Sequence, residues 1–205
     1  MTKAEIRKAI KEKLSANAAL IPQESKQLCK MILESDVYET AAAVAVYMAL
    51  PDEADLKPII QNALSRGKKV FIPRIFPGTN FMEFYQIETS NCVTQGSFGI
   101  QEPEPKQELS LTTFLNENQK DSAKAAPLTL LVLVPGRAFT KQGKRLGRGK
   151  GFYDIYFSKL QNAGYKNISI KKSGVCLSQQ LLAELPTTPD DIKMDLVFCA
   201  AEVSN

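Results

Sequence analysis

Apolar residues near the start of the chain recur with the spacing of amphipathic helices. Thr2 begins a capping box, and Ile6, Ile10 and Leu14 follow it at four-residue intervals. Residues 23–34 repeat the pattern. The sequence therefore predicts two helices at the start of the chain, each with one apolar face directed toward a core.

Farther along, apolar residues form continuous runs, which are typical of strands buried on both faces of a sheet. Residues 128–134 form the strongest run, and residues 41–49 form another. Further strands are predicted over residues 68–73, 81–87, 175–177 and 196–199, and further helices over residues 55–66, 113–118 and 152–162. Residues 97–126 are otherwise polar and proline-rich, which predicts irregular structure. Because helices alternate with buried strands, the predicted class is α/β with a mostly parallel sheet.

The length and the absence of repeats or linkers predict one domain over residues 1–205. The longest apolar run covers residues 41–50, which is too short to cross a bilayer. The charged N-terminus lacks the apolar region of a signal peptide, so we expect a cytoplasmic protein without a membrane partner. The four cysteines are scattered without a CxxC pair, and we expect reduced thiols in the core.

Composition narrows the chemistry mainly through what is missing. The sequence contains no histidine and no tryptophan. The lack of histidine excludes Ser-His-Asp and Cys-His nucleophilic catalysis, zinc sites with histidine ligands, and histidine phosphorelays. Any acid, base or metal chemistry must therefore use Asp, Glu, Lys, Tyr or Cys.

The positive charge of the chain is concentrated in one segment, residues 137–150, which we call the basic loop. The net charge is +4, and this loop holds six basic residues and no acidic one. Gly147, Gly149 and Gly151 alternate with basic residues there, which lets successive N–H groups converge on an anion. The loop lies between a predicted strand and a predicted helix, where α/β sheets bind phosphate. We favour a phosphate site over the alternatives, a flexible surface loop or a nucleic-acid contact.

A carboxylate follows the basic loop at Asp154, in the first turn of the predicted helix. An Asp in this place complements the helix dipole, or it holds Mg²⁺ beside a polyphosphate. A second carboxylate is available from Asp190, Asp191 and Asp195, which cluster before the last predicted strand. Spacing alone does not choose among these three.

The segment from Pro135 to Asp154 resembles the 5-formyltetrahydrofolate cyclo-ligase family, also called 5,10-methenyltetrahydrofolate synthetases. That family carries the pattern PG-x-x-F-x-x-x-G-x-RLG-x-G-x-G-x-YD. The matching residues are Pro135, Gly136, Phe139, Gly143, Arg145, Leu146, Gly147, Gly149, Gly151, Tyr153 and Asp154. The likeness continues in the family's order through Lys3, Arg7, Glu53, residues 72–74, Met82, Pro186, Asp191 and Asp195.

This resemblance implies a single three-layer α/β domain with helices on both faces of the sheet. It implies an ATP-dependent conversion of 5-formyltetrahydrofolate to 5,10-methenyltetrahydrofolate, with release of ADP and phosphate through a phosphorylated formyl intermediate. Mg²⁺ is the implied cofactor and ATP the co-substrate, and we expect a monomer that binds no nucleic acid. The alternative is another small ATP-dependent kinase or ligase that uses the same loop on a different acceptor.

The resemblance also assigns roles to individual residues. The catalytic charges are those of Arg145, Arg148 and Lys150. The ATP-binding residues are Lys3, Arg7, Arg145, Leu146, Gly147, Arg148, Gly149, Lys150, Gly151, Phe152 and Tyr153. The folate-binding residues are Glu53, Met82, Phe98 and Tyr153, and the Mg²⁺ ligands are Asp154 and Asp191. Phe98 stands where relatives often have tryptophan, and Asp190 where histidine is common. We expect Glu53 to lie away from the basic loop.

Overall fold

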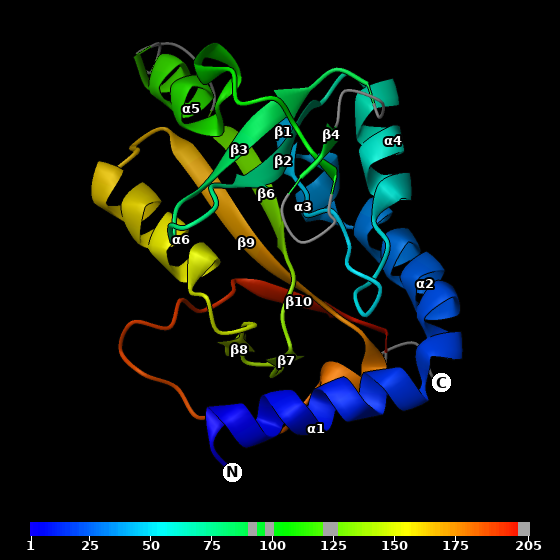
Figure 1. The fold of residues 1–205 in the computed structure, drawn as a ribbon. Coiled ribbons are helices and arrows are strands. Elements are labelled where there is room, and N and C mark those ends of the chain that lie inside the picture. Colours follow the sequence, from blue (N-terminus) through cyan, green and yellow to red (C-terminus); the bar gives the residue numbers. More distant parts are fainter. Residues whose placement is uncertain (90–93, 97–100, 121–126, 201–205) are drawn as a thin grey trace.

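The structure is a computed structural model that describes residues 1–89, 94–96, 101–120 and 127–200 (Figure 1). Its α-helices are α1 (Lys3–Ala16), α2 (Ile21–Leu33), α3 (Asp36–Glu39), α4 (Lys57–Ser65), α5 (Leu111–Lys120) and α6 (Phe152–Ala163). Its longer strands are β1 (Ala43–Ala45), β2 (Lys69–Ile75), β3 (Met82–Ile87), β6 (Leu128–Val134), β9 (Ile168–Cys176) and β10 (Leu196–Cys199). Two further sheets of two strands each pair β4 (Thr94–Gln95) with β5 (Gln101–Glu102), and β7 (Ala138–Phe139) with β8 (Arg145–Leu146).

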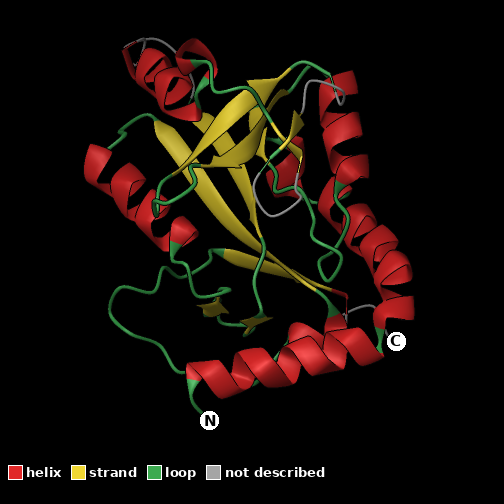
Figure 2. Cartoon of the chain, viewed as in Figure 1, coloured by secondary structure: helices red, strands yellow, loops and turns green. Residues whose placement is uncertain are grey.

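The six longer strands form one sheet in the order β10-β9-β6-β1-β2-β3. The strands are drawn in yellow in Figure 2. Neighbouring strands are parallel except for the pair β2 and β3, which is antiparallel. Helices follow β1 and β6 before the chain returns to the sheet, as parallel crossovers require. The predicted α/β class with a mostly parallel sheet is confirmed.

Alternate residues of the central strands supply two separate cores. Val44, Val70 and Leu131 face a cluster that also contains the apolar faces of α1, α2 and α4. Their neighbours Ala43 and Leu130 face the opposite cluster, which contains residues of α5 and α6. Successive side chains of a strand point to opposite faces, so a sheet that is buried on both sides needs the continuous apolar runs seen in the sequence. The sheet thus has helices on both faces, as the resemblance implied.

Two strands, β1 and β9, differ from their predicted lengths by several residues, and local pairing explains both differences. β1 covers only three residues of the predicted run 41–49, because the chain leaves the sheet after Val46 donates to the carbonyl of Phe71 at 2.8 Å. β9 is longer than the predicted 175–177. Residues 168–172 pair with β6 alone, residues 173 and 174 pair with both β6 and β10, and residues 175 and 176 pair with β10. Polar residues are tolerated on that unpaired edge, so the apolar signal was absent there.

The cysteines that the structure describes lie in the core, as expected. Cys29, Cys176 and Cys199 are buried, whereas Cys92 lies outside the described residues. No helix in the described part of the chain is long and apolar enough to span a membrane.

The strand order reverses at β1, which lies between β2 on one side and β6 on the other. From β1 the chain passes to β2 on one side, and β6 later occupies the other side of β1. The carboxyl ends of β1 and β6 therefore lie side by side at this edge of the sheet. Open α/β sheets bind ligands in the crevice at such a switch point.

Candidate active site

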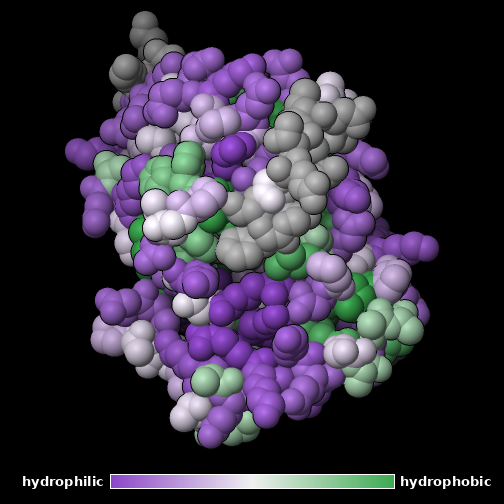
Figure 3. Space-filling model, in the orientation of Figure 1, coloured by the Kyte–Doolittle hydropathy of each residue, from purple (hydrophilic) through white to green (hydrophobic). Residues whose placement is uncertain are grey.

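A pocket of about 690 Å³ opens at the carboxyl ends of β1, β2 and β6. Its volume suits a small-molecule ligand, since such sites usually measure roughly 300–1,000 Å³. Residues from the loop after β1, from the end of β2 and from the loop after β6 line it together. In Figure 3, hydrophilic residues gather over the region of β7 and β8, on the face shown.

The basic loop lines one side of this pocket, as predicted. It leaves β6, forms the β7–β8 hairpin and leads to α6, which begins at Phe152. Gly149 has a φ of 104° and Gly151 a φ of 71°, which are left-handed conformations that favour glycine. Gly151 is the N-cap of α6, so the unpaired N–H groups of this helix begin beside the pocket.

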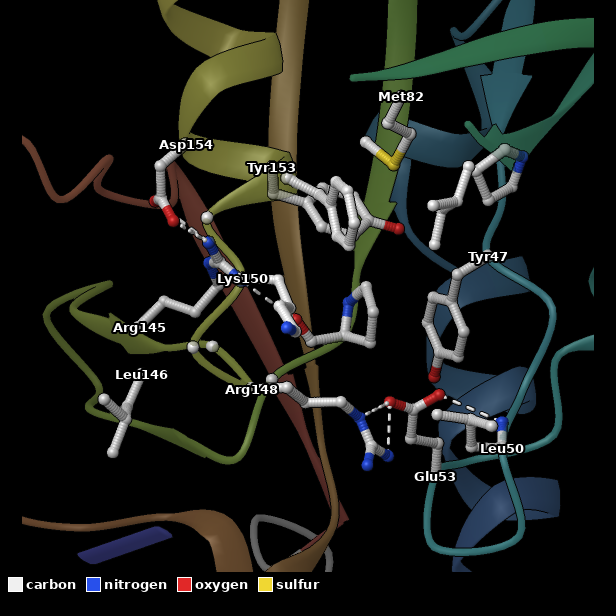
Figure 4. A pocket seen from close by; sticks show the side chains of 18 of the residues that line it. Tyr47, Leu50, Glu53, Met82, Arg145, Leu146, Arg148, Lys150, Tyr153 and Asp154 are labelled. Atoms are coloured by element: carbon white, nitrogen blue, oxygen red, sulfur yellow. Dashed lines mark hydrogen bonds and ion pairs between the residues drawn. The ribbon is translucent and has the colours of Figure 1, made fainter. Parts of the chain in front are cut away.

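Arg145 is the most deeply buried cation of the site. Its side chain is 4% exposed, and its Nη2 donates to both carboxylate oxygens of Asp154 at 2.9 Å. Its guanidinium carbon lies 5.5 Å from the ring centroid of Tyr153 (Figure 4). Its Nε is buried and has no hydrogen-bond partner among the described residues. The pair orients both side chains and leaves one polar atom of Arg145 unsatisfied.

Arg148 contacts the two acidic residues that follow β1. Its Nε and Nη2 lie 2.9 Å and 2.8 Å from Oε1 of Glu53, and its Nη2 also donates to Oδ1 of Asp52. Figure 4 shows Arg148 extending across the pocket to Glu53. The expectation that Glu53 lies away from the basic loop is wrong. The two loops meet because β1 and β6 are adjacent in the sheet, although 95 positions separate Glu53 from Arg148 in sequence.

Glu53 is a buried carboxylate that faces apolar and aromatic side chains. The residue is 8% exposed, and its Oε2 accepts the N–H of Leu50 at 3.0 Å. Burial, with a further contribution from the Glu53 charge, raises the pKa values of Tyr47 and Tyr153 well above their ordinary value. Both phenols therefore stay neutral at any physiological pH, and both rings line the pocket.

The other cations expected to bind ATP differ in whether they already have a partner within the protein. Nε of Arg7 donates to the carbonyl of Gly147 at 2.8 Å. Lys150 is exposed at the pocket and forms no ion pair among the described residues. Lys3 lies outside the described lining of the pocket, and its Nζ lies 2.5 Å from Oδ2 of Asp191. Burial alone would raise the pKa of Asp191, but hydrogen bonds from Lys3 and from the Thr188 N–H lower it below its ordinary value.

Asp154 and Asp191 line the same pocket, as their predicted shared role requires. The N–H of Ile192 donates to Oδ1 of Asp154 at 3.3 Å, which places the segment after Asp191 against Asp154. Carboxylate oxygens are the ligands that Mg²⁺ prefers, and one or two of them suffice when phosphate supplies the rest. The donor types therefore fit Mg²⁺. The described residues contain no group of three or more metal-binding side chains.

Most residues expected to hold the folate also lie in the pocket. Met82 and Tyr153 line it, whereas Phe98 lies outside the described residues. Sequence reasoning missed Tyr47 and Ile75, which are further lining residues. Tyr47 follows β1 and Ile75 ends β2, and these two strands are parallel. The rule that ligands bind at the carboxyl ends of parallel strands would therefore have identified both residues.

Comparison with known proteins decides the family. The sequence profile of the "5-formyltetrahydrofolate cyclo-ligase family" matches residues 1–200. The chain belongs to the 5-formyltetrahydrofolate cyclo-ligase family. The family recognised from the loop motif is thereby confirmed, and with it the class of enzyme, a ligase that closes a folate ring with ATP as co-substrate.

Relatives of known name and known structure match along nearly the whole chain. A Schizosaccharomyces pombe protein named "Probable 5-formyltetrahydrofolate cyclo-ligase" is 32% identical over 90% of this chain and 87% of its own. The 5-formyltetrahydrofolate cyclo-ligase of Mus musculus is 25% identical over 96% of this chain and 90% of its own. The solved structure of Aquifex aeolicus 5,10-methenyltetrahydrofolate synthetase superposes with a TM-score of 0.72, at 26% identity, covering 98% of this chain and 90% of that chain. This structural match confirms the predicted α/β fold.

Proposed function

We propose that this pocket binds ATP and 5-formyltetrahydrofolate side by side and carries out the ring closure there. The observation that carries the proposal is the contact of Arg148 with Glu53 at 2.8–2.9 Å. It brings the expected phosphate loop and the expected folate carboxylate to one site, so the γ-phosphate and the formyl group can meet.

On the ATP side, the basic loop and α1 supply the charges. Lys150 and Arg7 meet the phosphates first, because neither forms an ion pair with a described carboxylate. Arg145 adds charge from a buried position, Arg148 adds it from beside Glu53, and Lys3 adds it once released from Asp191. Backbone N–H groups of the loop and of the first turn of α6 complete the phosphate site. The members of this ATP site are Lys3, Arg7, Arg145, Leu146, Gly147, Arg148, Gly149, Lys150, Gly151, Phe152 and Tyr153.

On the folate side, Glu53 provides the polar anchor. A carboxylate can accept the paired N–H groups along the edge of a pterin ring. Met82 and Tyr153 supply further apolar surface in the pocket, and we add Tyr47 and Ile75 because they line the same pocket. Phe98 completes the set as a stacking residue.

The reaction follows from bringing these ligands together. The formyl oxygen attacks the γ-phosphorus and displaces ADP, which gives an imidate-like phosphate. N10 then closes on the activated carbon, and phosphate leaves. Such a transfer depends on positioning and on neutralising charge more than on a general base. Arg145, Arg148 and Lys150 neutralise that charge, which suits a sequence without histidine.

Mg²⁺ would be held by Asp154 and Asp191, with phosphate oxygens as further ligands. When bound, it offsets phosphate charge and orients the transferred group. Asp154 must then share its oxygens with Arg145, and Asp191 must give up part of its contact with Lys3. We also propose a cytoplasmic monomer that uses no nucleic acid.

Mixing the protein with Mg²⁺-ATP and 5-formyltetrahydrofolate tests the function. We expect absorbance from the methenyl product, and ADP release that depends on the folate. ADP release without the folate, or with a different acceptor only, would instead favour the alternative, another ATP-dependent kinase or ligase. A Glu53→Gln variant should weaken folate use about tenfold or more without weakening ATP binding, because it removes one charged acceptor.

A further inference from the structure

Four charged side chains form a continuous chain between the loop after β1 and the basic loop. Arg137 donates to Oδ2 of Asp52, and Oδ1 of Asp52 accepts from Arg148. Arg148 in turn contacts Oε1 of Glu53. Arg148 and Glu53 line the pocket, whereas Asp52 and Arg137 are outside its described lining. The inner pair therefore meets the ligands, and the outer pair determines where the inner pair rests.

Arg148 and Glu53 contact each other through the same groups that the two ligands need. A phosphate that takes Arg148 must compete with Asp52 and Glu53 for its guanidinium. A folate ring that takes Glu53 must compete with Arg148 for Oε1, because Oε2 already accepts the N–H of Leu50. Binding of either ligand therefore removes a competitor of the other.

Asp52 is well suited to hold the arginine in this place. Burial alone would raise its pKa, but the hydrogen bonds from Arg148 and Arg137 outweigh burial and lower the pKa below the ordinary value. The carboxylate is therefore ionised at neutral pH. Arg137, whose side chain is 11% exposed, fixes its second oxygen.

We propose that Asp52, held by Arg137, is a positioning residue that keeps Arg148 against Glu53 and thereby couples ATP binding to folate binding. The inference rests on the proposed function, because it takes phosphate and folate as the two ligands. Each ligand releases the group that the other requires, so the two bind with positive cooperativity. Linkage requires that each ligand raises the affinity of the other by the same factor.

Calorimetry with Mg²⁺ and the non-hydrolysable analogue adenylyl-imidodiphosphate measures this coupling, with and without saturating 5-formyltetrahydrofolate. In the wild type we expect the folate to raise the affinity for the analogue about tenfold, within the usual range of such couplings. In Asp52→Asn we expect the analogue alone to bind roughly threefold tighter, since the guanidinium has lost one charged partner. The coupling should then fall to about threefold or less, and Asp52→Glu, which keeps the charge, should restore it.

Asp55→Asn is the matched control, because it makes the same charge change three residues along. Asp55 Oδ1 accepts the N–H of Lys57 at 3.0 Å and takes no part in the chain of four side chains. This variant should keep the wild-type affinity and coupling.

Two results would overturn the inference. One is a wild-type coupling factor of one or below, which needs no variant and so does not depend on any variant folding. The other is a folded Asp52→Asn protein with wild-type affinity and coupling. Failure of the proposed function looks different, because the wild type would then bind neither ligand or form no methenyl product.

Discussion

The cations at the pocket differ in what an incoming phosphate must displace. Arg145 and Arg148 are already paired with carboxylates. Arg7 contacts a backbone carbonyl, and Lys150 forms no ion pair in the described part of the chain. A cation without a carboxylate partner gains the full benefit of a phosphate, because no existing ion pair is lost. Lys150 should therefore contribute strongly to ATP affinity.

Lys150→Ala should raise the KM for ATP about tenfold or more, on the scale of one lost charge-assisted hydrogen bond. The KM for the folate should change little. Steady-state kinetics checks this, with Lys144→Ala as the control from the same loop, outside the described lining of the pocket. Equal effects of the two substitutions on the KM for ATP would show that the loop acts only through its net charge.

Asp154→Asn should lower turnover at limiting Mg²⁺ by roughly tenfold or more, because it keeps the shape of the side chain but removes a charge that offsets the cation. Excess Mg²⁺ should restore part of the loss. The melting temperature should also fall, since the buried Arg145 loses its charged partner. The two readouts separate metal binding from stability.

Asp190→Asn is the control for this substitution, because Asp190 is exposed and forms no ion pair among the described residues. It should leave the Mg²⁺ dependence near that of the wild type. A larger effect of Asp190→Asn, or an unchanged Mg²⁺ dependence in Asp154→Asn, would mean that the metal assignment is wrong.

Sequence patterns indicate candidate site residues where chemistry and spacing coincide, but they do not reveal contacts that arise only when the chain folds. The glycine-rich motif and Asp154, which the sequence analysis assigned to one site, line the same pocket. The ion pairs of Asp52 with Arg137 and Arg148 left no trace in the sequence, because 85 and 96 positions separate the partners. The position of Glu53 was misjudged for the same reason, since strand order is not visible in local patterns.

At the scale of the secondary-structure elements, Gly143 joins the basic loop to the segment before β10 through a backbone hydrogen bond. The N–H of Gly143 donates to the carbonyl of Thr140 at 3.0 Å. The carbonyl of Gly143 accepts the N–H of Met194 at 2.9 Å. Its φ is 87°, and a Cβ there would lie 2.3 Å from the carbonyl oxygen of Met194. A side chain would therefore meet both backbone strain and a rigid neighbour.

Gly143→Ala should destabilise the fold by about 3 kcal/mol, from left-handed strain and overpacking together. Gly78→Ala is the matched control, because Gly78 has a φ of 76° but no atom within 4 Å of its Cβ position. It should cost only about 1 kcal/mol. At about 2–4 °C per kcal/mol for a chain of this size, thermal melting resolves the two. Equal shifts would show that the contact with Met194 relaxes freely.

Secondary structure was predicted best where one rule applied along a whole element. β6 and β10 have the predicted bounds, and α6 begins at the predicted residue, because apolar runs and a preceding glycine mark them. β9 changes its partner along its length, from β6 at its start to β10 at its end, so no single pattern describes it. The antiparallel pairing of β3 with β2 likewise depends on the path between strands and not on either sequence.

Across the whole molecule, two aspartates link segments that are distant in sequence. Asp191 connects the segment before β10 to α1 through Lys3, and Asp52 connects the loop after β1 to the basic loop. Both carboxyl groups have pKa values below the ordinary 3.8, because hydrogen bonds from their cationic partners outweigh burial. Each therefore stabilises the folded state only while it is ionised.

This stabilisation has a definite sign with pH. A carboxyl group whose folded pKa is depressed contributes in full above its unfolded pKa, near 3.8, and loses the contribution as the pH falls through the folded pKa. Asp191→Asn and Asp52→Asn should therefore lower the free energy of unfolding most at pH 7 and progressively less below pH 3.8. The asparagine resembles the protonated acid, so wild type and variant converge in acid. Urea unfolding at several pH values measures the difference, with Asp190→Asn as the unpaired control. A deficit that is as large in acid as at pH 7 would mean that these aspartates act through shape and not through charge.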